Sequence, residues 1–126
     1  MWARFNPNPS GRNVGDCAVR AIAKAMNTTW EDAYSGLAVE GMLLHDMPSA
    51  NAVWGSFLRN HGYEREIVPN TCPDCYTLND FCADHPQGMF IVALDNHVVA
   101  VCDGSFYDTW DSGNEIPIYF YKKTEE

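Results

Sequence analysis

The periodicity of apolar residues divides the chain into two parts. In the first part apolar residues recur with helical spacing, which predicts helices over residues 16–26, from Trp30 to about Leu43, and from Pro48-Ser49 to His61. After Gly62, short apolar runs separated by turn residues predict strands instead. The expected strands are 63–68, 89–94, 97–102, 105–108 and 116–121, with one short helix over 78–84 that Thr77 caps.

The order of these elements predicts an α+β fold in a single domain over residues 1–126. Residues 1–15 are expected to form an arm or loop, because their proline and glycine residues exclude a helix. Residues 16–62 form the predicted helical half, with its first helix central and largely buried. Residues 63–122 form a half built on an antiparallel sheet.

The turns of the second part predict how its strands pair. Asp103-Gly104 is typical of a two-residue hairpin turn, since such turns need positive φ. This turn places Asp108 opposite Val99, so Asp108 becomes the diagonal neighbour of His97 on the same face of the sheet. The same pairing puts Trp110 opposite His97 and turns Asp111 to the other face.

Two strands carry signals of their position in the sheet. Strand 97–102 is apolar on both faces, which is typical of a central strand. Pro117 has no backbone N–H to donate, which predicts an edge position for strand 116–121.

Composition narrows the classes of partner. With 46% hydrophobic residues the 126-residue chain is long enough and apolar enough to fold around a core. The net charge of −9, with no Lys/Arg cluster, argues against binding to nucleic acid or to an anionic membrane surface. A peptide or protein is the expected partner.

The same composition indicates a compartment. No segment has the apolar core of a signal peptide or the length of a membrane span, so we expect a cytoplasmic protein. The odd number of five cysteines favours reduced thiols over disulfides.

The candidate chemistry begins at Asp16-Cys17. Asp16 is the expected N-cap of the first helix, with its carboxylate accepting from free backbone N–H groups. Cys17 is then the first helical residue, where the positive end of the helix dipole favours thiolate over thiol. Arg20 and Lys24, one turn apart, are expected to form a polar ridge on this helix. We therefore predict that Cys17 is a nucleophile.

His97 and Asp108 supply the remaining parts of a predicted catalytic triad. His97 would take the proton of Cys17, and Asp108 would orient the imidazole and stabilise its charged form. The oxyanion would be held by the backbone N–H of Cys17 and by a side-chain amide upstream, with Asn13 as the candidate and Asn8 in reserve.

These motifs resemble the papain-like cysteine peptidase superfamily. Gly15-Asp16-Cys17 opens a central helix, Asn96-His97 opens a sheet half, and Tyr107-Asp108 follows in the third triad position. The similarity is to small microbial and phage-encoded members akin to bacteriocin-processing peptidases. It implies a papain-like fold and hydrolysis of a peptide or isopeptide amide through a thioester, without a cofactor.

Other interpretations of the same residues stay open. The triad would also serve a deamidase or a transglutaminase-like enzyme, and the fold could persist as an inactive interaction module. A structural zinc site is a further possibility. The spacing C-x2-C-x6-C-x2-H would supply four ligands, Cys72, Cys75, Cys82 and His85.

Overall fold

The computed structural model describes residues 1–124, which form four helices and one six-stranded sheet. The helices are α1 (Cys17–Met26), α2 (Trp30–Leu44), α3 (Asn51–Asn60) and α4 (Leu78–Asp84). The strands are β1 (Trp2–Arg4), β2 (Tyr63–Ile67), β3 (Met89–Leu94), β4 (His97–Cys102), β5 (Ser105–Asp108) and β6 (Tyr119–Lys123). The α+β class predicted from the sequence is confirmed.

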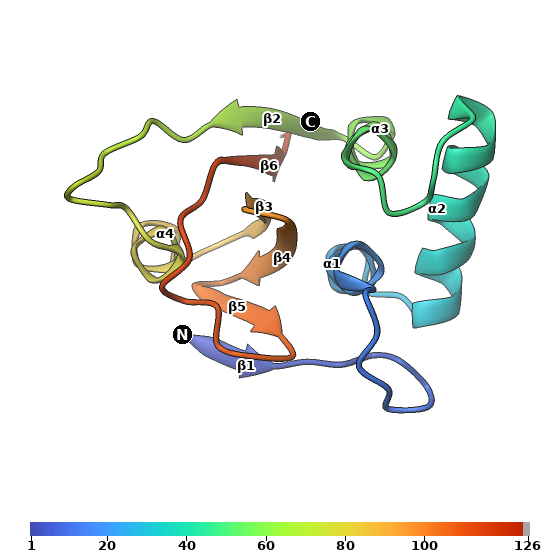
Figure 1. Ribbon diagram of the computed structural model, residues 1–126, viewed down its shortest axis with the longest axis horizontal. Helices are drawn as coiled ribbons and strands as arrows, with labels where there is room; N and C mark the ends of the chain where they lie inside the picture. Colours follow the sequence, from blue (N-terminus) through green and yellow to red (C-terminus); the bar gives the residue numbers. More distant parts are fainter. Residues whose placement is uncertain (125–126) are drawn as a thin grey trace.

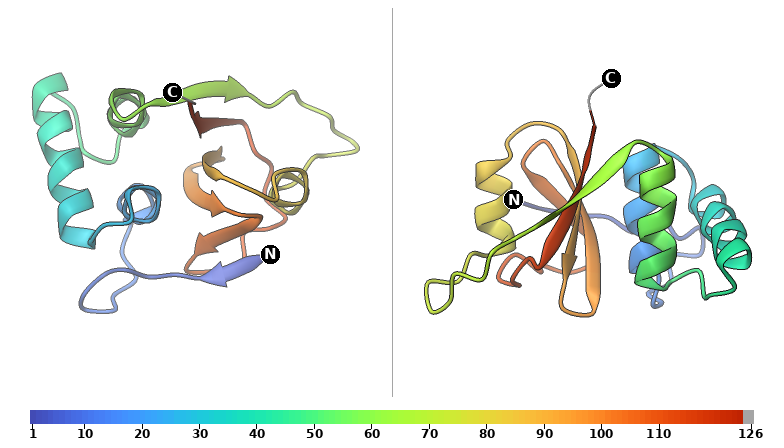
Figure 2. Two further views of the ribbon diagram at one scale, coloured as in Figure 1. Left: turned by 180° about the vertical axis from the view of Figure 1, so that it is seen from behind. Right: turned by 90° about the horizontal axis from the view of Figure 1, so that it is seen from above.

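The elements stack in three layers. Helices α1, α2 and α3 lie on one side of the sheet, and α4 lies alone on the other side (Figures 1 and 2). Helix α1 lies between the sheet and α2, which makes it the central helix of its half (Figure 1). None of the described helices is both long enough and apolar enough to cross a membrane.

The strands follow the order β1-β5-β4-β3-β6-β2. All neighbours pair antiparallel except β1, which runs parallel to β5 with Trp2 beside Phe106 and Arg4 beside Asp108. The predicted arm over residues 1–15 therefore starts with a strand. No local signal pointed to it, because its partner is about a hundred residues away in the chain.

The sheet corrects one prediction and confirms another. The last strand begins at Tyr119 and pairs with both β3 and β2, so its predicted edge position is wrong. Pro117 precedes the paired segment, and its missing N–H costs the ladder nothing. Strand β4 is interior, as its two apolar faces predicted.

Strand β4 contributes to two hydrophobic clusters, one on each face of the sheet. Val98 and Ala100 pack in the cluster that contains α1, α2 and α3. Val99 and Val101 pack in the cluster that contains α4. Because successive side chains of a strand point to opposite faces, one continuous apolar strand serves both layers. This burial on both faces suits β4 to its interior position, whereas the turns at its two ends, at Asn96 and at Asp103-Gly104, set its register and hence the position of His97 at its start.

The helix caps agree with the sequence in one case and differ in another. Thr77 caps α4, as predicted, and forms a capping box with Asp80. Helix α2 is capped by Thr29, whose hydroxyl accepts from the Asp32 backbone N–H at 3.1 Å. The spacing of Thr28 and Glu31 predicts a capping box with Thr28 as the cap, but Thr28 instead donates to the Asp32 carboxylate.

Candidate active site

Cys17 lies at the first position of α1, in a cleft between the helical layer and one end of the sheet. The cleft has a volume of about 370 Å³. Its walls come from the start of α3, the turn between β3 and β4, and the segment just before β6, and they include Ser49, Asn51, Trp54, Asp95, Asn96 and His97. The start of a helix and the start of a strand thus bring Cys17 and His97 to one site.

The Asp16 carboxylate does not cap α1, contrary to the sequence prediction. It accepts from the Trp30 indole Nε1 at 2.9 Å and from Arg20 one turn along the helix. Arg20 is itself buried, so it is not part of an exposed ridge with Lys24. A buried carboxylate and a buried guanidinium need each other as partners, which outweighs the local capping bond.

His97 and Asp108 are directly hydrogen-bonded. His97 Nε2 lies 2.6 Å from Asp108 Oδ2, which leaves Nδ1 of the ring for the thiol of Cys17. The Asp108 side chain is 1% exposed, and it also accepts from the Ser112 hydroxyl at 2.7 Å and from the Thr109 backbone N–H at 2.8 Å. Arg20 Nη2 adds a bond of 3.2 Å to its second oxygen. The carboxylate is therefore held in one orientation.

The register predicted for the hairpin of β4 and β5 is confirmed. Strands β4 and β5 pair Cys102 with Ser105, Val101 with Phe106 and Ala100 with Tyr107, the register expected from the Asp103-Gly104 turn. One further step along this register brings Asp108 beside the start of β4.

Strand β5 ends at Asp108, so the paired register does not extend to Trp110 and Asp111. Asp111 is exposed, and its carboxylate accepts from the Gly113 backbone N–H rather than from His97. The Trp110 ring lies 5.5 Å from the His97 ring and covers it on one side, although the indole itself is 46% exposed.

The three side chains shift one another's pKa. Burial lowers the pKa of His97, but the hydrogen bonds to Asp108 and Cys17 and their charges raise it to about 9. Burial raises the pKa of the Cys17 thiol, yet the His97 hydrogen bond, a backbone hydrogen bond with Val98 and the nearby positive charges bring it below its ordinary value. The pKa of Asp108 is lowered despite burial, chiefly by the hydrogen bond with His97.

The directions of these shifts favour a thiolate beside an imidazolium over a neutral thiol beside a neutral imidazole. Such a pair can attack an electron-poor carbon and then deliver a proton to the departing group.

The structure does not place Asn13 in the cleft. Asn13 is exposed in the loop before α1, and it lies outside the residues that line the cavities beside Cys17. Asn8 accepts from the Ser10 backbone N–H within the same loop. The side-chain amides that do line the cleft belong to Asn51 and Asn96.

Sequence reasoning missed Asn51 because nothing near it in the chain marks it. It is the first residue of α3, and only the packing of α3 against α2 and β2 brings it to the cleft that Cys17 lines. The Asn51 Oδ1 accepts from the Trp54 indole at 3.0 Å, which anchors the amide at this wall of the cleft.

The four residues of the possible zinc site do not come together within residues 1–124. Cys72 and Cys75 form a disulfide, Cys82 is buried in the core, and the His85 ring stacks on Phe81. Within residues 1–124, no group of three or more His, Cys, Asp or Glu side chains has the arrangement of a metal site. The expectation of reduced cysteines is wrong for Cys72 and Cys75, whose Cα atoms lie 4.1 Å apart.

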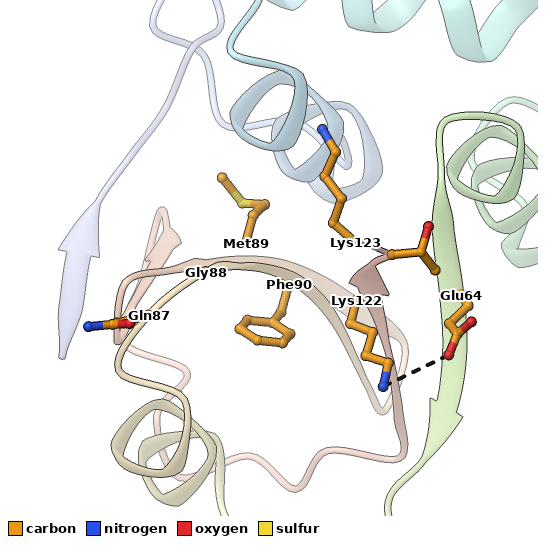
Figure 3. Close-up of a pocket in the computed structure, with 8 residues that line it drawn as sticks. Glu64, Gln87, Gly88, Met89, Phe90, Lys122 and Lys123 are labelled. Carbon is orange, nitrogen blue, oxygen red and sulfur yellow. Dashed lines mark ion pairs between the residues drawn. The ribbon is translucent and has the colours of Figure 1, made fainter. Parts of the chain in front are cut away.

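A larger cavity than this cleft lies at the other end of the sheet from Cys17. It has a volume of about 850 Å³ and is lined by residues at the start of β3 and the end of β6 (Figure 3). Lys122 forms ion pairs there with Glu64 at 3.8 Å and with Glu66 at 2.6 Å. None of the three predicted triad residues lines it, so size alone does not mark the chemically interesting site.

Comparison of the chain with protein-family models, with curated proteins and with solved structures identified no match. The chemistry of the cleft is therefore the basis of a functional proposal.

Proposed function

We propose that the protein is a cysteine peptidase that hydrolyses a peptide or isopeptide amide through a triad of Cys17, His97 and Asp108. The observation that carries the proposal is the 2.6 Å hydrogen bond between His97 and Asp108, with Cys17 and His97 lining the same open cleft and His97 lowering the pKa of the Cys17 thiol. A papain-like relationship is part of the proposal. Its support is a central helix that begins with the cysteine and packs on a sheet that carries the histidine.

The first half of the proposed reaction forms a thioester. The Cys17 thiolate attacks the carbonyl carbon of the scissile amide and gives a tetrahedral oxyanion. His97 then transfers its proton to the amide nitrogen, the carbon–nitrogen bond breaks, and the amine leaves. Asp108 keeps the ring oriented and stabilises its charged form throughout this step.

The second half returns the enzyme to its starting state. Neutral His97 takes a proton from water, the resulting hydroxide attacks the thioester carbon, and the carboxylic acid leaves with expulsion of the Cys17 thiolate. Each step moves one proton through one imidazole, so no other co-reactant than water is needed.

The oxyanion needs hydrogen-bond donors beside Cys17. The backbone N–H of Cys17 is one proposed donor, since the first N–H groups of a helix have no partner inside the helix. The Asn51 amide is the second, because it lines the cleft and is anchored by Trp54. Asn13, the donor predicted from the sequence, has neither property.

Alkylation by iodoacetamide across pH tests whether Cys17 belongs to an ion pair. We expect Cys17 to react faster than the other free cysteines at neutral pH, and its rate to rise with pH through a pKa below the ordinary value of 9.0. Cys102 is an internal control in the same molecule, because burial and the adjacent Asp103 raise the pKa of its thiol. If Cys17 titrates at or above 9.0, the fold is that of an inactive interaction module.

A peptide library analysed by mass spectrometry then identifies the reaction, with Cys17→Ser as the inactive control. Cleavage by the wild-type protein alone supports the peptidase. Conversion of a side-chain amide to an acid without cleavage, or its coupling to an amine, contradicts the peptidase and indicates a deamidase or transglutaminase-like enzyme.

A further inference from the structure

A second pocket lies beside Cys17, on the side of α1 that faces α2. Its volume is about 350 Å³, within the range of roughly 300–1,000 Å³ in which proteins bind small ligands. Asp16 and Ala18, the chain neighbours of Cys17, both line it. Its other walls include Val14, Trp30, Tyr34, Met47 and Pro48.

This pocket and the triad cleft meet at Ser49, which lines both. Cys17 lies between them, since it lines the cleft while its two chain neighbours line the pocket. An extended peptide advances about 3.3 Å per residue, so a chain bound across Cys17 would place neighbouring residues over both. The pocket therefore adjoins the site where the proposed reaction takes place.

The pocket presents rings and alkyl groups rather than charge. The carboxylate of Asp16 is 5% exposed and is already engaged by Arg20 and by the Trp30 indole N–H. Trp30 and Tyr34 stack with ring centroids 5.1 Å apart and form one aromatic wall.

The opposite wall of the pocket is apolar too. It is formed by Met47, which is 68% exposed and therefore free to contact a ligand. The triad cleft differs, because Asp95, Asn51 and Asn96 line it.

We propose that this pocket is a specificity subsite that binds a bulky apolar side chain of the substrate, of the Leu, Met or Phe kind. That side chain belongs to a residue next to the amide that Cys17 attacks, on the α2 side of the cleft. The inference rests on the proposed function, because it assigns the pocket to the same reaction. Burial of the side chain between the aromatic wall and Met47 provides the binding energy.

The subsite is tested by comparing two alkylating reagents on the full chain. Iodoacetamide has no group that reaches the pocket, whereas N-phenethyl-iodoacetamide carries an aromatic group of suitable size. The rate of Cys17 modification is measured with each reagent, and the ratio of the two rates is compared with that in the urea-unfolded protein. The ratio cancels the reactivity of the thiol itself, so it reports on the pocket alone.

Two variants make the comparison specific. Met47→Glu places a charge on the pocket wall. Leu43→Glu makes the same change at an equally exposed apolar residue of α2, 68% exposed, that does not line the pocket.

We expect the folded wild type and Leu43→Glu to prefer the phenethyl reagent about tenfold over the unfolded protein, the gain from burying one apolar group. Met47→Glu is expected to lose most of this preference. A ratio equal to that of the unfolded protein overturns the subsite, and so does an equal loss in both variants. A Cys17 thiol with an ordinary pKa contradicts the proposed function instead, and it leaves the ratio unchanged.

Discussion

Arg20 and Asp108, 88 residues apart in the chain, are joined by a buried ion pair of 3.2 Å. Arg20 belongs to the helix that begins with Cys17, and Asp108 is the partner of His97. Since Arg20 also binds Asp16, one guanidinium serves two buried carboxylates. The contact ties the helical layer to the sheet at the point where the proposed triad forms.

Replacement of Arg20 tests this connection. Arg20→Met leaves the carboxylates of Asp16 and Asp108 buried without their shared cation, so we expect a loss of about 3–5 kcal/mol in the free energy of unfolding. Urea denaturation measures it. Arg12→Met is the control, because Arg12 is exposed and a surface change of this kind costs about 0.5 kcal/mol or less. Equal stability of the two variants would contradict the buried network.

The pH dependence of activity tests the role of Asp108. In the proposed reaction the thiolate exists above the lowered pKa of Cys17, and His97 can donate its proton only below its own pKa of about 9. The rate should therefore be high near neutral pH and fall as pH rises through about 9. Asp108→Asn removes the carboxylate that raises the His97 pKa, so this alkaline limb moves toward the ordinary value of 6.5.

The same variant is expected to lower kcat by about 10³–10⁴-fold, because the amide no longer holds the correct tautomer of the ring. Asp111→Asn is the matched control: Asp111 is exposed, three residues along, and makes no bond to His97. If Asp111→Asn shifts the alkaline limb and Asp108→Asn does not, the assignment of the third residue is wrong.

Two asparagines distinguish the proposed oxyanion donors. Asn51→Ala removes a side-chain amide from the cleft, and loss of one such donor reduces kcat by about 10²–10³-fold. Asn13→Ala removes an exposed amide outside the cleft and is expected to leave kcat nearly unchanged. The kinetics of both variants on one cleaved peptide decide the question. A large effect of Asn13→Ala alone would restore the donor predicted from the sequence.

Thiol counting tests the disulfide. The unfolded protein, kept without reductant, should titrate three free thiols, those of Cys17, Cys82 and Cys102, and five after reduction. Cys75→Ser should release the thiol of Cys72 and add one to the unreduced count. Titration of all five cysteines in the unreduced wild type would show that the pair is not joined.

Local signals in the sequence were sufficient for all the described helices and strands except β1, and for the placement of two residues of the predicted triad, Cys17 and Asp108. The Asp103-Gly104 turn fixes the register of β4 and β5, and this register determines which carboxylate lies near His97. The helix that begins at Cys17 is equally local, because Gly15 ends the preceding loop and an unbroken helical pattern follows. These features depend on residues within about ten positions of one another.

The contacts that the sequence did not predict depend on residues far apart in the chain. The sequence predicts that the Asp16 carboxylate caps α1, but in the structure it binds Arg20 and Trp30 instead. Asn51 reaches the cleft only because α3 packs against α2 and β2, and no pattern around residue 51 predicts this packing. The C-x2-C spacing of Cys72 and Cys75 suits a metal as well as a disulfide, and only the loop conformation separates the two.

The parallel pairing of β1 with β5 joins segments that are synthesised far apart in time, which bears on when the proposed activity could begin. In addition to the strand pairing, the Phe5 backbone N–H and the Trp2 indole both donate to the Asp108 carbonyl. The backbone of Asp108, the third residue of the proposed triad, is therefore held by residues 2–5. During synthesis, Cys17 emerges from the ribosome long before His97 and Asp108. Its thiol then has the pKa of an ordinary cysteine, because the groups that lower the pKa do not yet exist beside it. If Cys17 is the proposed nucleophile, its thiol becomes reactive only after the strand that begins with His97 has been synthesised and has packed against α1.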